Sequence, residues 1–159
     1  MRRRERGPKL PAYEPESPRM LHLVKLAVGV RDLAQLRAVQ AERAALAPPL
    51  RHRTRNSPRR AAEVTDGGSI YWVMSGMLAA RQRVLAITEA EWEDGSACAA
   101  LILDPALVAV AGRAMKPFQG WRYLPAADAP PDLDAPGVAV GAGALPAALA
   151  RELRALCLL

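Results

Sequence analysis

The feature that most constrains the fold is a run of alternating side chains that leads into a hairpin turn. Along residues 77–88, Arg81 and Arg83 fall on one face of an extended chain, and Gln82 and Val84 fall on the other. The turn signal Glu93-Asp94-Gly95-Ser96 comes next, and a second apolar run follows it. This pattern predicts an antiparallel β-hairpin in the middle of the chain.

Helices are expected on either side of this hairpin. Asp32 is a suitable N-cap for a helix with apolar residues at helical spacing, and Pro48 should stop that helix. A short helical turn is expected at 60–65, with a tight turn at Gly67-Gly68, and a last helix is expected within 145–156. The other extended segments are expected at 21–28, at 69–74 and, as a short piece, at 108–110. This order predicts an α+β fold, a small mixed or barrel-like β-sheet with flanking helices.

The composition favours one folded domain with a tail. The chain has 159 residues, of which 51% are hydrophobic, and residues 20–159 are expected to form a single α+β domain. Residues 1–19 contain four prolines and six basic residues but almost no large apolar ones. We expect this basic, proline-rich segment to be disordered, or to be an overextended gene start, because it has no apolar face to bury.

Several classes of protein are disfavoured by what the sequence contains. No apolar signal-peptide core follows the basic start, and the longest apolar stretch is too short to span a bilayer. We therefore expect a cytoplasmic location and no membrane partner. Two cysteines cannot build a disulfide scaffold, and two histidines are too few for most zinc sites. No metal or cofactor is expected, and the oligomeric state stays open.

The positive charge is concentrated in two places, residues 1–19 and the segment 51–60. The formal net charge is +6, and the segment 51–60 holds five arginines and no acidic residue. We expect this segment to be an arginine-rich loop, because a local basic cluster is typical of proteins with phosphate-rich partners. His52 lies among these arginines and by itself specifies nothing, whereas His22 is expected to be half-buried with its hydrogen bonds satisfied.

Recognition chemistry is better represented than catalytic chemistry. We find no nucleophile elbow, no phosphate-binding glycine loop ahead of a helix and no metal-spaced cysteine pair. Guanidinium groups bind phosphates, aromatic rings stack on bases, and amide side chains read base edges. The candidate binding residues are Arg53, Thr54, Arg55, Asn56, Arg59, Arg60, Tyr71, Trp72, Arg81, Arg83, Gln119, Trp121 and Arg122.

A structural role is the alternative for each group of candidates. The aromatic residues can be core residues, and Arg81 and Arg83 can pair with nearby acids instead of a ligand. The segment 118–123 should turn at Gly120, so that Gln119 or Arg122 reaches residues 52–60 or 81–83.

Five segments resemble a known protein family. They are MLHLVKL (20–26), TRNSPRR (54–60), GGSIYWV (67–73), RQRV (81–84) and FQGWRYL (118–124). Together they resemble the uncharacterised, mainly alphaproteobacterial proteins grouped as DUF1489, a family name that implies no established activity. The order of loop, glycine turn and strand is also similar, more weakly, to PUA-like domains of the ASCH and EVE groups, which are small barrels that bind RNA or modified bases.

These observations favour a small binding module for RNA, a nucleotide or a modified base, using an arginine-rich loop and an aromatic cleft. The alternatives are a small hydrolase or nuclease that acts on a phosphate-bearing substrate, or a protein–protein adaptor. An enzyme is disfavoured because the sequence offers no nucleophile–base pair or metal constellation.

Overall fold

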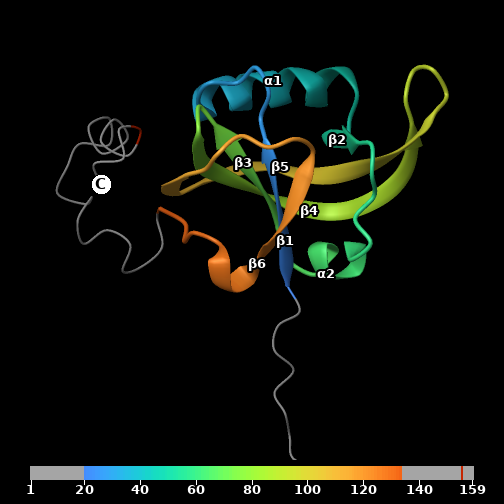
Figure 1. The fold of residues 1–159 in the computed structure, drawn as a ribbon. Helices are drawn as coiled ribbons and strands as arrows, with labels where there is room; N and C mark the ends of the chain where they lie inside the picture. The colour runs from blue at the N-terminus through green and yellow to red at the C-terminus, as the bar shows by residue number, and fades with distance from the viewer. Residues whose placement is uncertain (1–19, 134–154, 156–159) are drawn as a thin grey trace, which may run out of the picture.

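The architecture is a mixed β-sheet with one long helix across a face (Figure 1). A computed structural model describes residues 20–133 and Ala155. Its elements are β1 (Leu21–Leu26), α1 (Leu33–Leu46), β2 (Arg51–Thr54), α2 (Ala61–Thr65), β3 (Ser69–Met74), β4 (Met77–Glu91), β5 (Ala97–Ala114), β6 (Trp121–Pro125) and a 3-10 turn (Ala126–Asp128). The expected tail at 1–19 and the expected helix within 145–156 lie outside the described residues.

The sheet has the strand order β2-β5-β4-β3-β1-β6. The pair β1 and β3 is parallel, and the other neighbouring strands are antiparallel. The prediction of an α+β fold with a small mixed sheet is therefore confirmed.

The predicted hairpin is the pair β4 and β5. At its tip the Trp92 N–H donates to the Ser96 carbonyl (2.9 Å), and Gly95 adopts a φ of 82°. The predicted alternation is also present, because Gln82 and Val84 are buried whereas Arg83 is exposed. Residues 108–110 are extended, as expected, but they belong to β5, which continues from Ala97 to Ala114. The prediction of a separate element was wrong.

The first helix begins where its capping residue predicts. The Gln35 N–H donates to the Asp32 carboxylate (2.8 Å), and the helix ends at Leu46, before Pro48. Leu36 is the apolar residue of α1 that is buried, and it packs against the sheet residues of the main core.

The expected loop at 51–60 was wrong over its first four residues. Arg51–Thr54 form strand β2, which pairs with β5 from Arg51 opposite Ile102 to Thr54 opposite Ala99. The reason is non-local, because the open edge of β5 supplies backbone partners to any extended segment beside it. Only residues 55–60 connect β2 to α2, and the helical turn expected at 60–65 is present as α2.

The sheet curls until the segment after β2 touches the strand at the opposite edge, β6. The Trp121 indole N–H donates to the Asn56 carbonyl (3.0 Å), and the Arg60 backbone N–H donates to the Tyr123 hydroxyl (3.1 Å). Elsewhere, Leu133 N–H donates to the Ala109 carbonyl (2.9 Å), which adds the chain after β6 to the free edge of β5. These contacts give the sheet its barrel-like shape.

The core residues lie on both faces of the curled sheet. The concave face, under α1, buries Leu23, Ile70 and Leu101, whereas the other face buries Val24 and Tyr71 with their neighbours. Tyr71 and Trp72 are only 3% and 4% exposed, as expected for aromatic residues with a core role.

The Gly67-Gly68 turn is tight because of its second glycine. Gly67 adopts a φ of 85°, and a Cβ built on Gly68 would lie 2.3 Å from both the Leu21 and the Val64 carbonyl oxygens. The close approach of these backbones joins α2 to the start of β1 and β3.

We predict that Gly68→Ala lowers the free energy of unfolding by at least about 3 kcal/mol, because backbone atoms have to move. Urea denaturation measures this change. The comparison variant is Gly95→Ala, which has open space around its Cβ and, unlike Gly68, a left-handed φ of 82°; it should cost only about 1–2 kcal/mol. Equal losses in the two variants would contradict the prediction.

Candidate functional site

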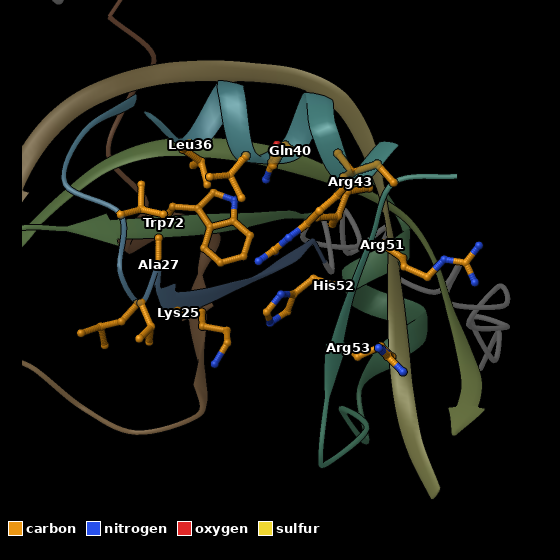
Figure 2. Close-up of a pocket in the computed structure, with 15 residues that line it drawn as sticks. Lys25, Ala27, Leu36, Gln40, Arg43, Arg51, His52, Arg53 and Trp72 are labelled. Carbon is orange, nitrogen blue, oxygen red and sulfur yellow. The ribbon is translucent and has the colours of Figure 1, made fainter. Parts of the chain in front are cut away.

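A cavity of about 290 Å³ opens between β1, β2 and α1 (Figure 2). Trp72 of β3 lies at its base. The volume is at the low end of the range for small-molecule sites. The cavity exists because the curl of the sheet brings β2 and β1 to face one another beneath the helix.

Three nitrogen-bearing side chains meet in this pocket from three elements. Lys25 comes from β1, Arg43 from the last turn of α1 and His52 from β2. None of the residues that line the pocket is acidic. Among residues 20–133, neither cation forms an ion pair, and Lys25 Nζ makes only a long hydrogen bond to the Gly120 carbonyl (3.4 Å). The pocket therefore carries positive charge without a balancing carboxylate.

His52 lies beside these two cations, and one of its ring nitrogens lacks a hydrogen-bond partner among the described residues. Its Nε2 is buried and has no hydrogen-bond partner in the described part of the chain. The ring packs edge-to-face on Trp72, with the ring centroids 5.3 Å apart. Burial lowers the pKa of His52 to about 4, and the charges of Lys25 and Arg43 contribute. Burial also lowers the pKa of Lys25. At neutral pH the imidazole is uncharged, with one donor and one acceptor nitrogen.

The neighbours of His52 in β2, Arg51 and Arg53, also line the pocket, but their guanidinium groups are engaged by other partners. Arg51 donates to the carbonyl oxygens of Pro48 and Pro49. Arg53 pairs with Glu93 (2.6 Å) and lies 5.0 Å from the centre of the Trp92 ring. Because side chains alternate along a strand, the two arginines lie on the other face of β2 from His52, at the edge of the pocket. Thr54, the last residue of β2, is buried.

A buried amide network supports the base of the pocket. Gln40 and Gln82 exchange two hydrogen bonds of 2.8 Å, so that α1 is joined directly to β4. Gln82 also accepts from the Trp72 indole N–H (3.2 Å) and donates to the Asp104 carbonyl (2.7 Å). This network fixes both Trp72 and the helix that carries Arg43.

A second group of sequence-predicted residues lies on the opposite face of the sheet. Arg81 makes a bidentate contact with Asp132 (2.6 and 2.8 Å) and donates to the Ser69 hydroxyl (3.3 Å). The hydrogen bond from Arg81 lowers the pKa of Asp132, and Tyr71 lies on this same face. Arg83 is exposed on the same side of β4. The charge of Arg81 is thus neutralised, which is the structural role considered for it.

The remaining candidates gather where residues 55–60 meet β6. Arg55, Asn56, Arg59 and Arg60 are exposed, and Trp121 is half-buried against this segment. Arg60 pairs with Glu63. Among the described residues, Trp121 donates a hydrogen bond to this segment and Tyr123 accepts one from it, whereas Gln119 and Arg122 form none with it. Arg122 instead lies 4.7 Å from the centre of the Phe118 ring.

The structure therefore brings together only part of the predicted site. Trp72 and Arg53 line the pocket, and the segment 55–60 lies against Trp121 where it meets β6, whereas Arg81, Arg83 and Arg122 lie on the other face of the sheet. Sequence reasoning missed Lys25, Arg43 and Gln40, and it dismissed His52. One signal was available for Lys25, because a lysine inside an otherwise apolar strand needs a reason to be there.

We predict that Gln82→Leu lowers the free energy of unfolding by about 3 kcal/mol, because it leaves the Gln40 amide, the Trp72 N–H and the Asp104 carbonyl without partners. Chemical denaturation measures the loss. The double variant Gln40→Leu, Gln82→Leu should recover part of it, since one buried amide is then no longer unsatisfied. A double variant that loses the sum of the two single effects would contradict this coupling.

We also predict that acid destabilises the fold through His52. Its pKa is about 4 in the folded chain and 6.5 ordinarily, so the unfolded chain binds the proton more readily between these values. The stability is complete above pH 6.5 and falls as the pH approaches 4, by about 2 kcal/mol between pH 7 and pH 5. Urea denaturation at both pH values measures this. His52→Gln should show a smaller loss, with the part due to His22, whose pKa is also lowered, remaining. An unchanged pH dependence in the variant would refute the assignment.

No helix of the described residues is long and apolar enough to cross a membrane. Within residues 20–133 and 155, no group of three His, Cys, Asp or Glu side chains is placed to hold a metal ion.

The chain was also compared with known proteins. No curated protein and no solved structure matches it significantly. One family profile, described as "Protein of unknown function (DUF1489)", matches residues 23–159, which include every described element except the first two residues of β1. The match covers most of the chain, so this protein belongs to the DUF1489 family.

Proposed function

We propose that this protein is a small binding module for RNA or a nucleotide-like ligand, and that Lys25 and Arg43 bind phosphate in the pocket. The observation that supports this best is the absence of any acidic residue from the pocket lining, together with three lining cations, Lys25, Arg43 and Arg51, that have no ion-pair partner in the described residues. An uncompensated positive pocket attracts anions, and a guanidinium suits phosphate geometry.

The segment 55–60 would extend the binding surface beyond the pocket. Lys25 joins the two places, because its side chain lines the pocket and reaches the Gly120 carbonyl beside Trp121. Arg55 and Arg59 are exposed there and would contact further phosphates, while the half-buried Trp121 would offer a face or edge to a base. The barrel-like sheet with a site at its margin is similar in layout to PUA-like domains, which supports the proposal by analogy only.

The enzyme alternative has less support. No hydroxyl, thiol or carboxylate side chain lines the pocket. His52 is a poor general base, because its pKa of about 4 lies well below neutral pH.

We predict a strongly salt-dependent affinity for RNA that weakens when the pocket cations are removed. Each lost phosphate contact should reduce the slope of log affinity against log salt by roughly 0.7 for a single strand, so Lys25→Ala, Arg43→Ala should reduce it by about 1.4. Fluorescence anisotropy with a labelled single-stranded RNA, at several salt concentrations, measures the slope. The double variant Arg55→Ala, Arg59→Ala should reduce the slope by a similar amount if the binding surface extends to the segment 55–60.

The matched control is Arg37→Ala, which removes an exposed arginine of α1 that does not line the pocket. It should leave both affinity and slope nearly unchanged. The proposal fails if RNA and mononucleotides do not bind, or if binding ignores both salt and the pocket variants.

A further inference from the structure

The pocket is lined by basic side chains and by no acidic one. Lys25 and Arg43 each bring a full charge without a carboxylate partner among the described residues, and His52 between them is neutral with its Nε2 unsatisfied. A buried polar atom without a partner normally needs an explanation, and a missing ligand is one. Arg51 is a third lining cation without a carboxylate partner in the described residues, but its guanidinium is held by the Pro48 and Pro49 carbonyl oxygens. The remaining two cations and one hydrogen-bonding ring match a group that carries two negative charges and several acceptor oxygens.

The two forms of phosphate in nucleic acids differ in this respect. An internal phosphodiester carries one negative charge, whereas a terminal phosphomonoester carries about −1.5 to −2 at pH 7 and offers three acceptor oxygens. They also differ in the room that they need, because an internal phosphate has chain on both sides. A pocket of about 290 Å³ suits a chain end or a single nucleotide better than a continuous strand.

We propose that the pocket selects a terminal phosphomonoester, either the phosphorylated end of an RNA strand or a nucleoside monophosphate. This inference rests on the proposed function and specifies which phosphate-bearing ligands the pocket binds. Lys25 and Arg43 would share the charge, and His52, in the tautomer protonated at Nε2, would donate to a phosphate oxygen. Arg43 extends from the helix toward His52 and is exposed, so it can turn toward a phosphate beside the ring without moving the core (Figure 2).

The test compares RNAs that differ only at one end. Four versions of one ten-nucleotide single strand are needed, with a 5′-hydroxyl or a 5′-phosphate and a label at the 3′ end, and with a 3′-hydroxyl or a 3′-phosphate and a label at the 5′ end. At fixed salt, one of the phosphorylated ends should bind at least about tenfold more tightly than its hydroxyl counterpart. A nucleoside monophosphate should compete and the nucleoside should not. If only the monophosphate binds tightly, the ligand is the free nucleotide rather than a strand end.

The variant that tests the role of the ring is His52→Phe, which keeps an aromatic side chain against Trp72 and removes both nitrogens. It should weaken binding of the phosphorylated end more than binding of the hydroxyl end, and His52→Gln should restore part of the preference, whereas the control Arg37→Ala should leave both affinities nearly unchanged. In the unsubstituted protein, NMR of the histidine nitrogens gives a second measure. Adding a nucleoside monophosphate should raise the pKa of His52, whereas a purely structural histidine would not respond.

The possible failures can be told apart. If phosphorylated and hydroxyl ends bind equally, and Lys25→Ala, Arg43→Ala still weakens both, RNA binding stands and the terminal selection is wrong. If the preference survives in that double variant, the phosphate binds elsewhere and the inference is overturned. If none of the RNAs or nucleotides binds, the proposed function itself is wrong.

Discussion

The geometry of the pocket depends on one buried contact, the amide pair between Gln40 and Gln82. α1 buries few side chains, Leu36 and Gln40 in the described residues, so apolar packing alone gives it little hold on the sheet. The amide pair joins the helix to β4, and the same Gln82 holds the Trp72 indole. Because Arg43 lies three residues after Gln40, on the same side of the helix, fixing Gln40 also fixes the backbone that carries Arg43 over the pocket. A fully satisfied buried network is well suited to specify one arrangement.

Local signals in the sequence were sufficient for much of the fold. The Asp32 cap, the hairpin tip at Gly95 and the alternation along β4 each depend on neighbours within a few residues, and each appears where it was predicted. Strand β2 was not predictable in this way, because its pairing with β5 joins residues about fifty positions apart and its own composition is typical of a loop. The continuation of β5 to Ala114 likewise depends on its partners at either edge, β4 and residues 131–133.

The site was harder to predict than the fold. The density of arginine along the sequence does not show which arginines form ion pairs within the protein and which do not. Arg53 and Arg81 are neutralised by Glu93 and Asp132, which lie 40 and 51 residues further along the chain. Only the tertiary structure reveals these pairs. Of the three pocket-lining cations without a carboxylate partner in the described residues, Arg51 belongs to the basic cluster but donates to the Pro48 and Pro49 carbonyl oxygens. The other two, Lys25 in a mostly apolar strand and Arg43 at the end of a helix, belong to no basic cluster. The inward direction of His52 follows from the register of β2, so it was equally invisible before that strand was known.

The arrangement of the pocket has a consequence for stability as well as for binding. Burial lowers the pKa values of both Lys25 and His52, and the charges of Lys25 and Arg43 lower that of His52 further, so the folded chain holds these groups in a place that disfavours their charge. Burying Lys25 and His52 in this way does not favour folding. Residues that serve a binding site are commonly suboptimal for stability, so a binding role would explain why they are there. An anion in the pocket would offset the repulsion and satisfy the imidazole at the same time. Because the three side chains come together only in the folded state, such a ligand binds the folded chain preferentially and stabilises it in proportion to the logarithm of its concentration. A bound phosphate would thus offset part of the cost of holding these groups where their charge is disfavoured.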